Sequence, residues 1–182
     1  QMVEAYRLAL AADESIENYM EPVSIGAVLN DVAHELNPYA KQYVTELSVD
    51  VQGKFTPVLA HRASLMAALH CLGASLIRAQ ASHSPQPKYE LVFGAHRGPG
   101  NVIATGAFSN IHLLSDRTLR AARSLAGHAR QPLANMPAGA ASGVLIADLL
   151  CTSMWQPLRP AAHRKWGGLA TSIPVSKQLQ FV

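Results

Sequence analysis

Residues 31–40 read DVAHELNPYA and hold the first side chain that could take part in group transfer, His34. An imidazole can accept a phosphoryl group as a nucleophile. Apolar residues recur around it at steps of three and four, which predicts an amphipathic helix: Ile25, Val28, Leu29, Val32, Leu36, Tyr39 and Tyr43. At about 100° per residue, His34 falls on the opposite side of that helix, so we expect it to be exposed. Exposure is expected both for a phosphate-accepting histidine and for a surface histidine without a function, so it does not distinguish the two.

Other groupings of reactive residue types point to no familiar chemistry. The eight histidines show no His-x-x-x-His spacing and the two cysteines no Cys-x-x-Cys spacing, which speaks against a transition-metal site. Ser64 and Ser142 lack the Gly-x-Ser-x-Gly setting of a hydrolase nucleophile.

Two basic groupings could meet an acidic partner. Arg117, Arg120 and Arg123 recur every three residues, and a solvated helix face explains them better than a binding site. Residues 163–166 read HRKW, a basic stretch beside an aromatic ring that could stack on a nucleic-acid base. One such stretch without a series of aromatics is weak support for nucleic-acid binding.

The composition indicates one globular domain. The chain has 182 residues, 49% of them apolar and 15% charged, enough for one well-packed core. A net charge of +3 permits an anionic ligand but falls short of a nucleic-acid binder. There is no secretory signal and no apolar run of roughly 18 residues, so no membrane segment is expected. Cys71 and Cys151 lie in apolar helical patterns, which favours buried free thiols and a cytoplasmic location.

The periodicities predict alternating helices and strands along the chain. We expect helices at 2–19, 24–43, 65–76, 115–125 and 143–155, and strands at 47–51, 58–60, 89–95, 102–108, 158–163 and 169–175. Ser24 is the expected N-cap of the second helix, and turns are expected at Gly53, at 98–101 and at Gly167-Gly168. Residues 128–142 read as a long lid-like loop after a Gly127 cap. This order predicts an α/β fold, a two-layer α/β sandwich whose mixed sheet is covered on one face by helices.

Four stretches in this order resemble the ATP-binding domain of sensor histidine kinases, whose fold is shared with gyrase-type and Hsp90-type ATPases. MEPVSIGAVLNDVAHELNPYAKQY resembles its opening helix, HRASLMAALHCLGASLIRA the helix of its asparagine box, AGAASGVLIADLL its second glycine box, and KWGGLATSIPV its closing Gly-Gly turn and strand. The likeness implies a domain over 21–182. Residues 1–20 resemble the end of an upstream dimerisation helix, and we expect the chain to continue a longer protein.

The resemblance also decides about His34. In such kinases the phosphate acceptor lies on the first of two dimerisation helices, upstream of the ATP-binding domain. Only 41 positions separate His34 from Ser75, and they already include a predicted strand and turn. No second dimerisation helix fits between them, so we interpret His34 as a surface histidine.

The resemblance implies a site for ATP and Mg²⁺. The magnesium-binding asparagine of the family corresponds to Ser75, and Arg78 stands where a basic residue could reach a phosphate. In the second glycine box Gly143 matches a central glycine, while Gly139, Ser142 and the helix N-terminus could still bind an anion. The alternative that this loop simply caps a buried helix explains it better.

The family's adenine-binding aspartate has no counterpart. It should follow the second hairpin strand, yet no acidic residue occurs from Val102 until Asp116. Its loss would leave the adenine amino group unpaired in a pocket, at a cost of roughly 1–3 kcal/mol.

We therefore expect a signalling module of the histidine-kinase type with a degenerate nucleotide site, a pseudokinase with weak or no ATP binding. One alternative is an active histidine kinase domain that binds ATP and Mg²⁺ in a non-standard way; a nucleic-acid-binding module is the other. The implied partners are dimerisation helices of the same protein, giving a homodimer, and a response regulator.

Overall fold

A mixed five-stranded sheet forms one layer of the protein. The computed structural model describes residues 5, 7, 20–81, 88–111, 113–125, 140–154 and 157–175. Along the sheet the strands run β2 (Thr45–Val51), β4 (Tyr89–Gly98), β5 (Val102–Ser109), β7 (Trp166–Pro174) and β6 (Arg159–His163). β2 pairs with β4 in parallel, and the remaining pairs are antiparallel. A separate two-stranded sheet pairs β1 (Glu21–Val23) with β3 (Val58–Ala60).

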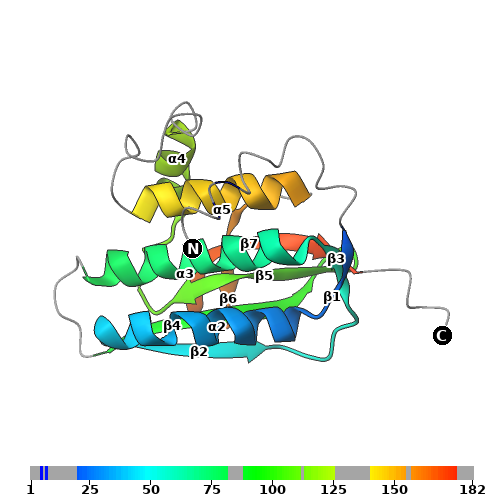
Figure 1. The fold of residues 1–182 in the computed structure, drawn as a ribbon, viewed down its shortest axis with the longest axis horizontal. Coiled ribbons are helices and arrows are strands. Elements are labelled where there is room, and N and C mark those ends of the chain that lie inside the picture. The colour runs from blue at the N-terminus through cyan, green and yellow to red at the C-terminus, as the bar shows by residue number, and fades with distance from the viewer. Residues whose placement is uncertain are drawn as a thin grey trace.

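The helices form the second layer. In Figure 1, α2 (Ile25–Gln42), α3 (Arg62–Ala81) and α5 (Ala140–Met154) run side by side along the sheet, with α4 (Asp116–Ser124) next to α5. Their apolar side chains share one buried core with one face of the strands, including Leu91, Phe93, Ile103, Ala107 and Leu169. The predicted two-layer sandwich with a mixed sheet is confirmed.

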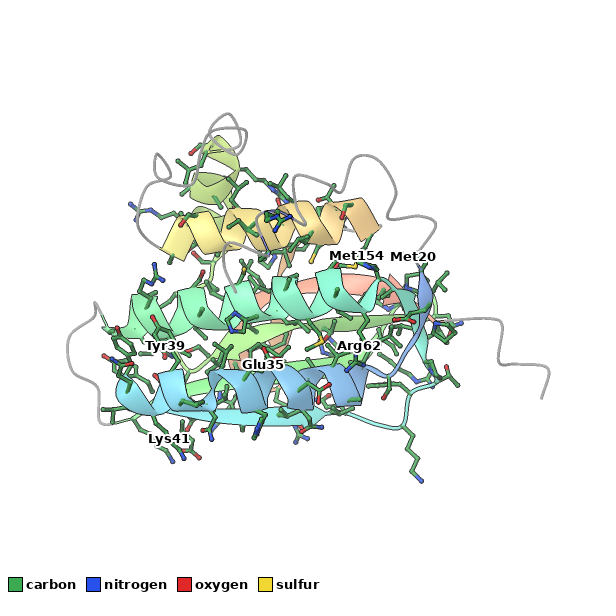
Figure 2. The ribbon with its side chains drawn as sticks, in the orientation of Figure 1. Met20, Glu35, Tyr39, Lys41, Arg62 and Met154 are labelled. Atoms are coloured by element: carbon green, nitrogen blue, oxygen red, sulfur yellow. The ribbon has the colours of Figure 1, made fainter. Side chains whose placement is uncertain are left out.

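Local signals set the ends and faces of α2 as predicted. Ser24 is its N-cap, and its Oγ accepts a hydrogen bond from the backbone N–H of Ala27 at 3.5 Å. The apolar positions from Ile25 to Leu36 are buried, and His34 is exposed as predicted. Arg62 at the start of α3 pairs with Asp31 of α2 at 2.6 Å, in the region between the two helices that Figure 2 shows.

The predicted hairpin is formed by β4 and β5. Its turn contains Gly100 at φ 77° and Asn101 at φ 57°, left-handed conformations that glycine and asparagine adopt most easily. The predicted turn at Gly53, with φ 111°, is also confirmed.

Three local predictions need correction. Strand β1 was not predicted, because three residues containing Pro22 carry no alternating pattern. α5 starts at Ala140, inside the loop predicted for 128–142. The last turn lies at Arg164-Lys165 and not at the two glycines, which belong to β7. Gly168 is needed there because a Cβ would lie 2.0 Å from the carbonyl oxygen of Ala107.

Some predictions concern residues outside the described ranges. These are most of the helix at 2–19, Gly127, and the part of the lid from 128 to 139. Within the described residues, no helix combines the length and the apolar character that crossing a membrane requires.

Candidate functional site

The predicted site residues Ser75 and Gly143 meet where α3 packs against α5. Both are buried, with Ser75 only 5% exposed. A Cβ at Gly143 would lie 2.1 Å from Ser75 Oγ and 3.2 Å from the carbonyl oxygen of Cys71. Glycine therefore allows the two helix backbones to approach closely, and the serine hydroxyl fills the remaining space.

The other predicted site residues are placed around this contact. Ser142 precedes Gly143 in the first turn of α5 and is buried, 3% exposed. Arg78 follows Ser75 by three positions, in the last turn of α3, and is partly buried. Gly139 lies outside the described residues. The structure thus brings Ser75 and Gly143 together, two positions that the resemblance assigned to separate motifs.

A buried polar network lies where β5 ends, at the place expected for the adenine-binding aspartate. The residue there is Ser109, and Gln80 of α3 donates to its Oγ through Nε2 at 2.9 Å. The same Gln80 accepts from Thr45 Oγ1 at 3.1 Å, so it joins α3 to β2 and β5. Gln80 is fully buried, with 0% of its surface exposed. The sequence did not single it out, because one polar residue near the end of an apolar helix carries no motif.

Asn110, the next residue, is bound to the start of β4. Its Oδ1 accepts from the backbone N–H of Glu90 at 3.1 Å, and its Nδ2 donates to the carbonyl of Lys88 at 3.0 Å. Ser109 Oγ also accepts from the backbone N–H of Ile111 at 3.1 Å. The two polar side chains that end β5 are therefore engaged in holding the hairpin and α3 together.

Asp148 on α5 is a structural residue. It accepts hydrogen bonds from Arg123 Nε at 2.8 Å and from the backbone N–H of Leu158 at 2.8 Å. The guanidinium of Arg123 also donates to the carbonyl of Leu158. Arg123 is exposed, as the view of the three arginines as a solvated face predicts, but its guanidinium also joins α4 to α5 and to Leu158, just before β6.

The basic stretch 163–166 is occupied by contacts within this chain. His163 is 1% exposed, and Arg164 pairs with Asp50. Trp166 donates from its indole nitrogen to Glu90 at 2.8 Å, while Lys165 Nζ lies 5.2 Å from the centre of the indole ring. These acidic partners neutralise the stretch and a lysine covers the ring, so the structure gives no support to base stacking here.

The two cysteines are buried free thiols, as predicted. Burial raises the pKa of both Cys71 and Cys151 to about 12, which keeps them protonated. Among the residues that the structure describes, no group of three or more histidine, cysteine or acidic side chains is arranged to hold a metal ion.

Comparison with known proteins relates the fold to histidine kinases. No family model matches the sequence, and no curated protein sequence matches it. Among solved structures, the Acinetobacter baumannii histidine kinase AdeS is similar with a TM-score of 0.63 and 12% identity, over 97% of this chain and 76% of that one. The catalytic domain of the histidine kinase ThkA is similar with a TM-score of 0.59 and 8% identity, over 86% of this chain and 95% of that domain.

A third similar structure is full-length ShkA in complex with AMPPNP. It has a TM-score of 0.63 and 15% identity, over 96% of this chain but only 35% of that longer one. The chain therefore has the fold of histidine kinase catalytic domains, as the sequence resemblance implied.

Proposed function

We propose that this chain is a signalling module of the histidine-kinase type whose nucleotide site has lost Mg²⁺-ATP binding, a pseudokinase. The observation that carries the proposal is the end of β5. Where the resemblance would place a carboxylate that accepts from an adenine amino group, the chain has Ser109, whose Oγ already accepts from Gln80 and from Ile111. An adenine placed there would have to break hydrogen bonds that the protein makes to itself, at about 1 kcal/mol or more for each.

The contact between α3 and α5 supports the same conclusion. A Cβ at Gly143 would lie 2.1 Å from Ser75 Oγ, so the two helices pack closely around the position that corresponds to the family's asparagine. A serine hydroxyl is also shorter than an amide and lacks the carbonyl oxygen that Mg²⁺ prefers. Both features support a weakened Mg²⁺-ATP site, and we derive no phosphoryl transfer through these residues.

One observation favours an active domain as the second candidate. Ser142, Gly143 and Ser75 gather at the first turn of α5, where backbone N–H groups and the helix dipole favour an anion. Together with Arg78 and Gly139, this end of the helix could bind phosphate in a non-standard way. Such a domain would use ATP and Mg²⁺ as a histidine kinase does.

In either case, the fold suggests where the module acts. We propose that it is cytoplasmic and joined through residues 1–20 to dimerisation helices of the same protein, forming a homodimer. A response regulator is the partner that such a module would address.

Titration calorimetry with ATP, with and without Mg²⁺, separates the two candidates. The pseudokinase proposal expects no heat of binding at millimolar ATP. Saturable, Mg²⁺-dependent binding in the micromolar range that weakens in Ser75→Ala would contradict it and support the active domain. His34→Gln is the matched control, because this exposed residue on α2 should leave either result unchanged.

A further inference from the structure

The last hairpin reaches across the sheet to the opposite edge strand. β2 and β6 are the two edges of the five-strand order. In a flat sheet, four spacings of about 4.8 Å would hold these edges roughly 19 Å apart. Yet Nε2 of His163, at the end of β6, lies 3.0 Å from Oδ2 of Asp50 on β2. The sheet must therefore curl until the β6–β7 turn lies across its face away from the helices.

Glycines on that face make room for the curl. A Cβ at Gly94 of β4 would lie 2.7 Å from the ring of His163, so any larger residue would displace the imidazole. On the neighbouring strand, a Cβ at Gly106 would lie 2.0 Å from the carbonyl oxygen of Leu169. The ring of His163 stacks on Phe108, with the ring centres 5.1 Å apart. The buried imidazole is therefore the group that packs the turn onto the sheet.

Hydrogen bonds restrict the protons that this group can carry. His163 Nε2 faces a carboxylate, so it donates to Asp50, while His163 Nδ1 lies 3.0 Å from Nδ1 of His96. Two imidazole nitrogens can share a hydrogen bond only when one is protonated and the other is not. The pair can be neutral or carry one added proton. A second added proton would place an N–H on both nitrogens and break the bond.

The charges around the pair are already balanced by one another. Asp50 of β2 accepts from both Nε and Nη2 of Arg164, which lies in the turn. Glu90 of β4 accepts from Trp166 and lies 4.0 Å from Lys165. Arg159 is a further cation on this face of β6 and is exposed. The described residues of β5 and β7 that share the face are uncharged: Ala104, Gly106 and Phe108, and Gly168, Ala170 and Ser172. None of these residues supplies a further negative charge that would stabilise two positively charged histidines side by side.

We propose that Asp50, His163 and His96 form a pH-sensitive latch that holds the β6–β7 turn across the sheet at neutral pH and releases it on acidification. Burial, and then the charge of His163, lower the pKa of His96 below its ordinary value of 6.5. A base with a lowered pKa binds its proton more weakly in the closed state than in the open state. The closed state is therefore stable above the ordinary histidine pKa and loses stability as the pH falls below it. The latch lies away from the predicted nucleotide residues and does not rest on the proposed function.

Hydrogen exchange of the turn tests the latch. Exchange of residues 159–166 is measured between pH 8 and pH 5, corrected for the intrinsic pH dependence, in the wild type, His96→Gln and His34→Gln. If the open state binds one more proton than the closed state, each pH unit changes the equilibrium between them about tenfold. The open fraction of the wild type should therefore rise about tenfold per pH unit below roughly pH 6. Glutamine can still donate to His163 but does not titrate, so His96→Gln should show a flat profile. His34→Gln removes an exposed histidine on α2 and should follow the wild type.

Two results would overturn the proposal. One is a slope that is the same in the wild type and in His96→Gln. The other is an acid-induced rise in exchange that is equally large in α2 and α3, which would indicate global unfolding. Because no nucleotide is present, either result leaves the proposed loss of ATP binding untouched.

Discussion

Gly143→Ala tests whether the contact between α3 and α5 is as close as the structure shows. Two effects of opposite sign compete. In a helix interior, alanine is more favourable than glycine by about 1 kcal/mol. Against this, the new Cβ would lie 2.1 Å from Ser75 Oγ, and inserting a carbon into a packed core costs about 1–3 kcal/mol. We expect the clash to win, with a net loss of about 1 kcal/mol.

The same substitution should behave differently when the serine hydroxyl is absent. In a Ser75→Ala background the nearest atoms to the new Cβ are the Cys71 carbonyl oxygen at 3.2 Å and the Cβ of residue 75 at 3.5 Å. The first distance requires a shift of only a few tenths of an ångström, and the second is ordinary van der Waals contact. Gly143→Ala should then be neutral or stabilising, which gives a coupling energy of about 1–2 kcal/mol between the two sites.

Urea unfolding of the wild type, both single variants and the double variant measures this coupling. Gly26→Ala is the matched control, because a Cβ at Gly26 in α2 meets no atom within 4 Å and should not destabilise the protein. Equal changes for Gly143→Ala in both backgrounds would refute the reasoning, since Ser75 Oγ could then not be what fills the space between the helices.

Two further predictions follow from buried polar and thiol groups. Asp148→Asn should lower the free energy of unfolding by about 1–3 kcal/mol, because the amide replaces the carboxylate that accepts from Arg123 and Leu158; an unchanged urea midpoint would contradict that role. Cys71 and Cys151 should resist iodoacetamide at pH 8 in the folded protein and react after unfolding, because burial raises each pKa to about 12. Mass spectrometry counts the modified thiols, and rapid labelling of the folded protein would show that they are accessible.

Much of the fold follows from signals local to each segment. The three- and four-residue steps of Ile25, Val28 and Leu29 and the Ser24 cap predict α2, since a helix forms from contacts between near neighbours. The turn at Gly100-Asn101 predicts the β4–β5 hairpin for the same reason. The last turn shows the limit of such signals: paired glycines suggested a bend, but Gly168 is required by the close approach of β5 within the sheet.

The candidate site was only partly readable in this way. Matching short stretches to a known family pointed to Ser75 and Gly143, but only the packing of α3 against α5 places them in contact. Gln80 was missed, because its structural role depends on hydrogen bonds to Thr45 and Ser109, which lie 35 and 29 positions away in the sequence. The ion pair of Arg123 could not be predicted for the same reason, since Asp148 reaches it only after α4 and α5 pack.

By itself, the sequence determined helices α2 to α5, every strand except β1, the two-layer sandwich and the absence of an acidic residue between Val102 and Asp116. Only the tertiary structure decided that the sheet curls far enough to place His163 on Asp50, 113 positions away. Periodicity reports which face of a segment is apolar, and it carries no information on how strongly a sheet twists. The curl of this sheet depends on glycines that let its backbones approach closely. The curl brings His96 and His163 together with Asp50.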